Sequence, residues 1–77
     1  MVYFEVGFKS GPYWSCNMVE VNTINEVRAA ITATRYAAEH AKRHSYEDYY
    51  VSTSSLRDWQ VDERKAKGMP IITMDEC

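Results

Sequence analysis

The chain has few cysteines, few glycines and no long apolar run, and each shortage excludes a class of protein. Two cysteines in 77 residues are too few for a secreted domain held by several disulfides, so we expect free thiols at Cys16 and Cys77. Three dispersed glycines exclude a glycine-rich loop that binds phosphates. No apolar run approaches the roughly 20 residues of a membrane-spanning helix, and the first residues lack a signal-peptide pattern. We therefore expect a cytoplasmic protein without membrane contact.

Positive charge is not in excess either. Nine Lys and Arg residues stand against eleven Asp and Glu residues, which gives a net charge of -2 and a sequence pI near 5.6. Non-specific binding to nucleic acid or anionic lipid depends on uncompensated positive charge, so the surface as a whole is not expected to attract either partner. At this length we expect one domain, residues 1–77, with a modest core.

Alternating apolar and polar residues predict a β-hairpin at the start of the sequence. Apolar side chains occupy every second position of its first strand, namely Val2, Phe4, Val6 and Phe8. Gly11 and Pro12 supply a turn, and a second strand follows over residues 13–21. The apolar positions of this second strand change parity near Met18, which predicts a β-bulge there.

Two helices and two more strands are predicted after the hairpin. Thr23 and Glu26 have the spacing of a capping box, so a long helix is expected from Ile24 onward. Its core-facing stripe is predicted to contain Val27, Ala30, Ile31, Thr34, Ala37, Ala38 and Ala41. Residues 49–54 predict a third strand and residues 70–74 a fourth. Between them, residues 56–67 predict a second helix capped by Ser55, with a hairpin as the alternative.

Together these elements predict a small two-layer α+β domain of order ββαβαβ. A mixed or antiparallel sheet is expected to pack under one long helix and one shorter helix. The predicted main core consists of Phe4, Val6, Phe8, Val27, Ile31, Ala38, Val51, Leu56, Trp59 and Ile72. Many functions occur on folds of this kind, so the fold class does not select one.

Residues suited to catalysis or metal binding form no recognisable motif. His40 and His44 lie one helical turn apart, but they lack the ligand spacing of known zinc sites, and Lys42 and Arg43 between them disfavour a dication. Adjacent acids occur where solvent-exposed side chains are expected, and no nucleophile elbow surrounds the serines. We therefore expect no catalytic residue, no metal site, no cofactor and no enzymatic activity.

Surplus tyrosine is the strongest functional feature of the sequence. We expect the two helices to cover only one face of the sheet, which would leave Tyr3 and one of Tyr49 and Tyr50 accessible on the other. Tyr36 lies on the predicted long helix. Exposed tyrosines contact protein partners or stack on single-stranded bases. The acidic pI favours contact with proteins. We therefore expect a non-enzymatic protein-interaction or regulatory accessory module, which could also self-associate, with these four tyrosines as contact residues.

The alternative function is nucleic-acid binding through the sheet tyrosines or a basic rail. Arg28, Arg35 and Lys42 are spaced by seven and form this rail along the long helix, although a solvated helix face is the preferred explanation of this spacing. Another side of the helix carries Ala29, Ala33, Tyr36 and His40, and we expect it to face away from the core. The identity of any partner and the oligomeric state do not follow from the sequence.

Overall fold

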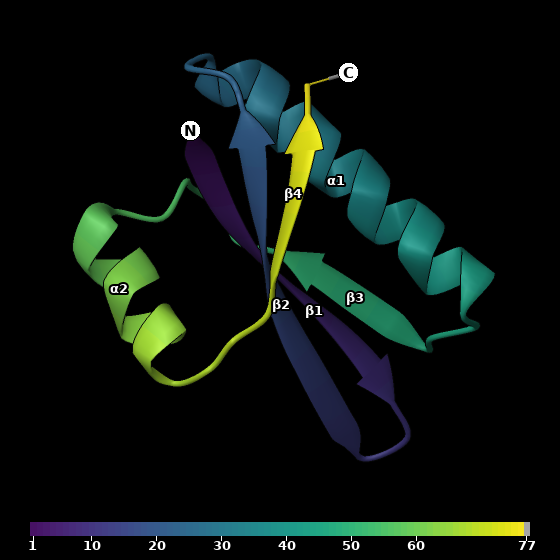
Figure 1. The fold of residues 1–77 in the computed structure, drawn as a ribbon. Coiled ribbons are helices and arrows are strands. Elements are labelled where there is room, and N and C mark those ends of the chain that lie inside the picture. Colours follow the sequence, from purple (N-terminus) through teal and green to yellow (C-terminus); the bar gives the residue numbers. More distant parts are fainter. Residues whose placement is uncertain (77) are drawn as a thin grey trace.

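The computed structural model describes residues 1–76, and its elements follow the predicted order (Figure 1). The strands are β1 (Val2–Ser10), β2 (Tyr13–Asn22), β3 (Asp48–Val51) and β4 (Ile71–Asp75), and the helices are α1 (Glu26–Arg43) and α2 (Asp58–Ala66). β1 pairs antiparallel with β2 and β3, whereas β4 pairs parallel with β2. The sheet order is therefore β3-β1-β2-β4, and the predicted small α+β domain with a mixed sheet, one long helix and one shorter helix is confirmed.

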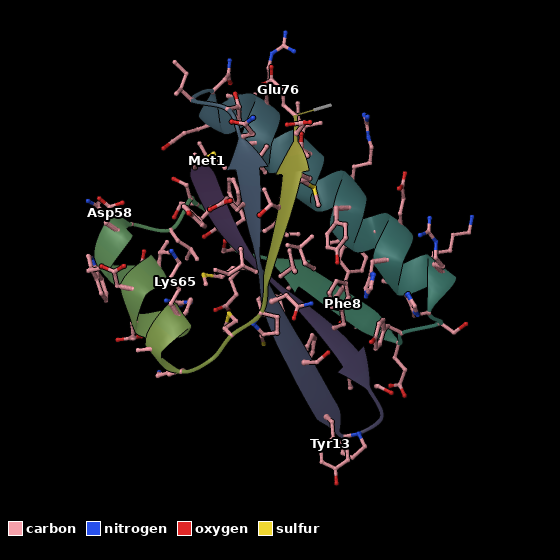
Figure 2. All side chains as sticks on the ribbon, in the orientation of Figure 1. Met1, Phe8, Tyr13, Asp58, Lys65 and Glu76 are labelled. Atoms are coloured by element: carbon pink, nitrogen blue, oxygen red, sulfur yellow. The ribbon has the colours of Figure 1, made fainter. Side chains whose placement is uncertain are left out.

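The hairpin of β1 and β2 is regular, and its turn carries Tyr13 away from both helices (Figure 2). Pairing runs without interruption from Val2 opposite Val21 to Ser10 opposite Tyr13, so the predicted bulge near Met18 is wrong. The change of parity has another cause. Val19 and Val21 face α1, Met18 faces the other side of the sheet, and all three are buried. The second half of β2 is thus covered on both faces.

α1 contacts the sheet through its smallest side chains. Ala29, Ala33, Ala37 and Ala41 are spaced by four, share one face of the helix and are buried in the main core cluster with the apolar residues of β1 and β2. The predicted core stripe is right at Ala37 and Ala41, which are buried, but wrong at Val27, which is 70% exposed, and at Ile31, which is 50% exposed. The sheet already supplies large side chains such as Phe4 and Phe8, so methyl groups on α1 fill the remaining space at native packing density.

The long helix begins two residues later than predicted. Asn25 is its N-cap and accepts a hydrogen bond from the N–H of Arg28 at 3.0 Å. The hydroxyl of Thr23 accepts from the N–H of Asn25 at 3.0 Å, so it stabilises the turn before the helix. The Glu26 carboxylate instead accepts from the Ser55 hydroxyl at 3.0 Å. Thr23 and Glu26 therefore do not form the predicted capping box, because Asn25 is the better placed capping side chain.

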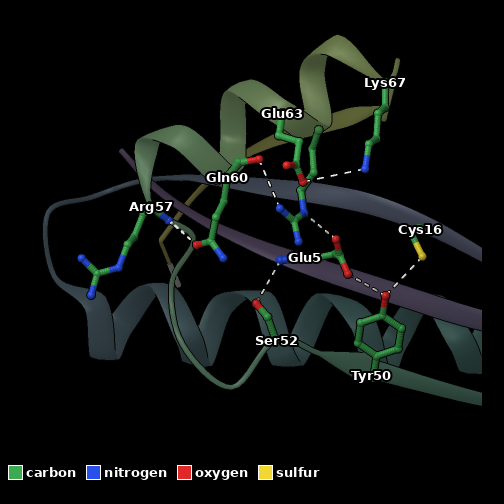
Figure 3. A network of polar contacts seen from close by, with 9 residues as sticks. Glu5, Cys16, Tyr50, Ser52, Arg57, Gln60, Glu63 and Lys67 are labelled. Carbon is green, nitrogen blue, oxygen red and sulfur yellow. Dashed lines mark hydrogen bonds and ion pairs between the residues drawn. The ribbon is translucent and has the colours of Figure 1, made fainter.

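α2 lies against the face of the sheet opposite α1, whereas the sequence predicted both helices on one face. Phe4 and Val6 point toward α1, so Glu5 between them points to the other side, where it forms an ion pair with Arg64 of α2. Seen edge-on, α2 lies above the strands and α1 below them (Figure 3). The sheet and α1 hold the main core, and α2 adds a short cover to one part of the opposite face.

α2 also begins later than predicted and turns a different side chain to the sheet. Its N-cap is Arg57, whose N–H donates to the Gln60 side chain at 2.8 Å, so Ser55 does not cap it. Val61 is buried, whereas Trp59 is 63% exposed and its predicted place in the core is wrong. The other predicted core residues fall into two groups: Phe4, Val6 and Phe8 are buried, and Ala38, Val51, Leu56 and Ile72 are half-buried.

Candidate functional site

Tyr50 occupies the face of the sheet that α2 partly covers. In the antiparallel pair of β1 and β3 it lies opposite Gly7, and its ring covers the place where a side chain at Gly7 would begin. A Cβ atom there would lie 2.0 Å from Cε2 of Tyr50, so this close approach requires glycine. Trp14 lies beside the same ring, with the two ring centroids 5.5 Å apart.

A polar network joins Tyr50 to α2 through Glu5 (Figure 3). The Tyr50 hydroxyl donates to Oε2 of Glu5 at 2.7 Å and lies 3.2 Å from Sγ of Cys16, a free thiol. Nε of Arg64 donates to Oε1 of Glu5 at 2.6 Å, and the hydroxyl of Ser52 accepts from the Glu5 N–H at 3.1 Å. One carboxylate therefore connects β1, β3 and α2.

Ionisation states in this network follow from the contacts. Burial raises the pKa of Glu5, but hydrogen bonds from Arg64 and Tyr50 and the charge of Arg64 outweigh burial, so the pKa lies below its usual value. Burial, followed by the hydrogen bonds to Cys16 and Glu5, raises the pKa of Tyr50 well above its usual range. At neutral pH Glu5 is ionised and Tyr50 is protonated, so each donor has an acceptor.

Tyr3 lies on the same face as Tyr50, with Glu5 between them in β1. Its hydroxyl donates to Oε2 of Glu20, and this bond is the main reason why the pKa of Tyr3 is raised to about 12. Nζ of Lys65 lies 5.7 Å from the centroid of the Tyr3 ring, so α2 partly covers it. We predicted an accessible Tyr3, but it is half-buried because α2 occupies the face that was expected to be open.

Tyr36 and Tyr49 lie on the α1 side of the sheet and so apart from Tyr3 and Tyr50. Tyr49 is opposite Phe8 in the β1–β3 pair. Tyr36 stacks on His40 with ring centroids 5.4 Å apart, and the ring centroids of His40 and Phe8 are 4.6 Å apart. The structure therefore separates the four candidate tyrosines into two pairs on opposite faces.

His40 and His44 pack as aromatic rings at the end of α1. Their ring centroids are 4.4 Å apart. Burial is the main cause that lowers the pKa of His40, and the charges of His44 and Arg43 add to it, so His40 is neutral at pH 7. Within residues 1–76 no group of three or more His, Cys, Asp or Glu side chains is placed to share a metal ion. Cys77 lies outside the described residues.

The outer side of α1 carries an apolar surface made largely of residues that were predicted to face the core. We call it the α1 stripe: Val27, Ala30, Ile31, Thr34 and Ala38, extended by Ile24, which precedes the helix and is 95% exposed. Two adjoining shallow hollows run along it, one between Ala30 and Ala38 and one between Asn25 and Ile31. The basic rail of Arg28, Arg35 and Lys42 is exposed and follows one side of the stripe.

One signal in the sequence identifies the true core face of α1. Four alanines at positions 29, 33, 37 and 41 repeat with the spacing of one helical face, whereas bulky Val27 and Ile31 lie on the opposite side. Hydrophobicity alone favours the bulkier face, which carries Val27 and Ile31. A helix face made of regularly spaced small residues packs well against strands rich in Phe and Val. This criterion selects the alanine face for the core and leaves the α1 stripe exposed.

Comparison of the chain with protein-family models, with curated proteins and with solved structures finds no match. Within residues 1–76 no helix combines the length and the apolar character needed to cross a bilayer.

Proposed function

We propose that this protein is a non-enzymatic protein-interaction module of the accessory or regulatory kind, and that the α1 stripe is its main contact surface. The observation that carries the proposal is the solvent exposure of Val27 and Ile31 on α1 and of Ile24 just before it. Single exposed apolar residues are ordinary, but a contiguous apolar patch is typical of a surface that a partner covers. We infer a cytoplasmic location from the low cysteine content.

Tyr36, Tyr49 and Tyr50 support this proposal as secondary contacts, and Tyr3 supports it least. Tyr49 and Tyr50 each expose more than a third of their surface, and Tyr50 forms a wider aromatic area with Trp14. Aromatic side chains of this kind are enriched in protein interfaces. The hydroxyl of Tyr3 is bound to Glu20 and its ring is partly covered by Lys65, so it offers a partner little free surface.

Nucleic-acid binding has less support. The basic rail is exposed, but it borders an apolar stripe instead of a wider positive surface, and the net charge is -2. Binding through Arg28, Arg35 and Lys42 would release counterions, so the affinity for labelled single or double strands would fall steeply with salt. A flat titration at low salt would exclude this function, and a salt-dependent one that Arg35→Glu abolishes would favour it over our proposal.

An affinity-capture experiment with matched variants tests the proposal. The 77-residue chain is immobilised as wild type, as Ile31→Lys in the α1 stripe, and as Tyr13→Ser at the exposed tip of the hairpin, far from the stripe. Circular dichroism first establishes that all three fold alike. We expect at least one protein from a native extract, or the chain itself, to bind wild type and Tyr13→Ser but not Ile31→Lys. Identical capture by all three would overturn the proposal.

A further inference from the structure

The α1 stripe has a shape and a charge that define what can occupy it. Short side chains at Ala30, Thr34 and Ala38 leave a shallow hollow beside Ile31, and Arg35 borders this hollow. A large flat apolar group fills such a hollow better than another small side chain does. Because the basic rail follows one side of the stripe, acidic residues next to that apolar group would pair with it. The complementary surface is therefore a bulky aromatic residue flanked by carboxylates.

The outer face of α2 has these properties. Trp59 is 63% exposed, and Asp62 and Glu63 follow it by three and four residues, which places both acids beside it on the same helical face. Both acids are exposed. The side chain of Glu63 is 3.7 Å from Nζ of Lys67, but this is an exposed pair within one helix, and such pairs contribute little and exchange readily.

The basic side chains of α2 that lie nearest the sheet are turned away from this outer face. Arg64 is bound to Glu5 at 2.6 Å, and Lys65 lies over the ring of Tyr3. Both contacts are on the sheet side of α2, opposite the exposed indole. The solvent side of α2 therefore presents an aromatic residue with acidic neighbours.

We infer that the α1 stripe binds α2 of a second copy of this chain, with Trp59 in the hollow beside Ile31 and with Asp62 and Glu63 against the basic rail. The inference rests on the proposed interaction through the α1 stripe and adds the identity of the partner. Both surfaces are largely exposed in one copy and are complementary in shape and charge.

The fold prevents one molecule from joining its own two surfaces. α1 and α2 lie on opposite faces of the sheet (Figure 3), so the stripe of one copy can reach only the α2 of another. In this head-to-tail contact, a chain of molecules keeps one free stripe at one end and one free α2 at the other. An antiparallel pairing of two α1 helices about a twofold axis is disfavoured, because it brings both basic rails to the same side.

The contact is small, which determines how it must be measured. A stripe on one helix against one side of a nine-residue helix buries less than a standard interface of about 1,600 Å², so it belongs to the weak, transient class. Sedimentation equilibrium should therefore extend to roughly 1 mM protein. We expect the average mass of the wild type to rise with concentration and to rise less at high salt, because the rail and the acids contribute.

Two single variants and their mixture test the head-to-tail arrangement. Ile31→Lys disables the stripe and leaves α2 intact, whereas Trp59→Ala does the reverse; both positions are exposed, so the fold should survive. Each variant alone should associate about 30-fold more weakly than the wild type. Their equimolar mixture should form a 1:1 dimer of nearly wild-type affinity, because each supplies the surface that the other lacks. Tyr13→Ser is the matched control and should behave as wild type.

A second measurement follows the indole directly. In Trp14→Phe the only tryptophan is Trp59, and its fluorescence should shift to shorter wavelength as the concentration rises, because the ring leaves water. Addition of Ile31→Lys to this variant should remove the shift.

Several outcomes would overturn the inference. These are a wild type that stays monomeric at the highest concentration, a Trp59→Ala variant that associates as wild type does, or a mixture of the two variants that does not associate. If the chain is monomeric but another protein is captured in a manner that depends on Ile31, the proposed function survives and only this inference falls. If nothing is captured and the chain is monomeric, both fall.

Discussion

Replacement of Gly7 by alanine should destabilise the fold, although the same change in an ordinary strand is favourable. The Tyr50 ring lies over the position of the missing side chain, with Cε2 at 2.0 Å and Cζ at 2.6 Å from an added Cβ. The methyl group and the ring cannot both stay in place. Because Tyr50 is on an edge strand and partly exposed, the ring will swing outward.

The cost follows from the contacts that the ring gives up. Its hydroxyl loses the 2.7 Å hydrogen bond to the Glu5 carboxylate and the contact with Cys16. A hydrogen bond to a charged group contributes about 1.5–3 kcal/mol, and partial exposure of Tyr50 places this one near the lower end. Loss of ring packing brings the cost to about 2–3 kcal/mol, and the usual gain from Gly to Ala offsets about 0.5–1 kcal/mol. The net loss should be about 1–2.5 kcal/mol in the free energy of unfolding.

Urea unfolding of four proteins tests this reasoning: wild type, Gly7→Ala, Tyr50→Ala and the double variant. The three atoms nearest an added Cβ at position 7 all belong to this ring, so Gly7→Ala in the Tyr50→Ala background should be neutral or slightly stabilising. The coupling free energy should be about 2 kcal/mol. If Gly7→Ala stabilises the wild type, or costs the same in both backgrounds, the ring does not lie over Gly7.

Two further changes address the polar network and the alanine face. The pKa of Glu5 is lower in the folded protein than its ordinary value of 4.5. Ionised Glu5 therefore stabilises the fold at pH values above 4.5, and this stabilisation is lost as the pH falls through the folded pKa. Urea unfolding from neutral pH to about pH 3 should therefore show a smaller acid-side loss for Glu5→Gln than for wild type; parallel profiles would contradict this. Ala33→Leu should cost about 1–3 kcal/mol in thermal or urea unfolding through overpacking, whereas Thr34→Leu on the outer side should stay within about 0.5 kcal/mol, and equal effects would show that the face is misassigned.

The strands and the element order follow from the sequence because their signals are local. Apolar and polar residues alternate with a period of two in β1, and β3 is rich in β-branched and aromatic residues. Both patterns can be recognised without knowing the partner strand. The orientation of α1 does not follow in this way. Both sides of that helix carry apolar residues, so the choice between Ala33 and Ile31 depends on how much space the sheet leaves, which is a tertiary property.

The candidate site depends even more on tertiary contacts. The sequence correctly indicates that tyrosines occur near the sheet, but the hydrogen bonds of Tyr3 and Tyr50 to glutamates depend on cross-strand register and on the face that α2 covers. The exposure of Trp59 likewise depends on tertiary structure. A start of α2 at Asp58 brings Val61 to the sheet and leaves the indole in solvent.

The strand order has a consequence for how the chain folds during synthesis. β1 and β2 come first in the described sequence and lie at the centre of the sheet, while the edge strands β3 and β4 come later. The central hairpin can pair within microseconds, whereas a ribosome adds only about 5–20 residues per second. The hairpin therefore has time to pair before α1 emerges, although α1 is needed to cover its apolar face, and each later strand is added to an edge of this central pair.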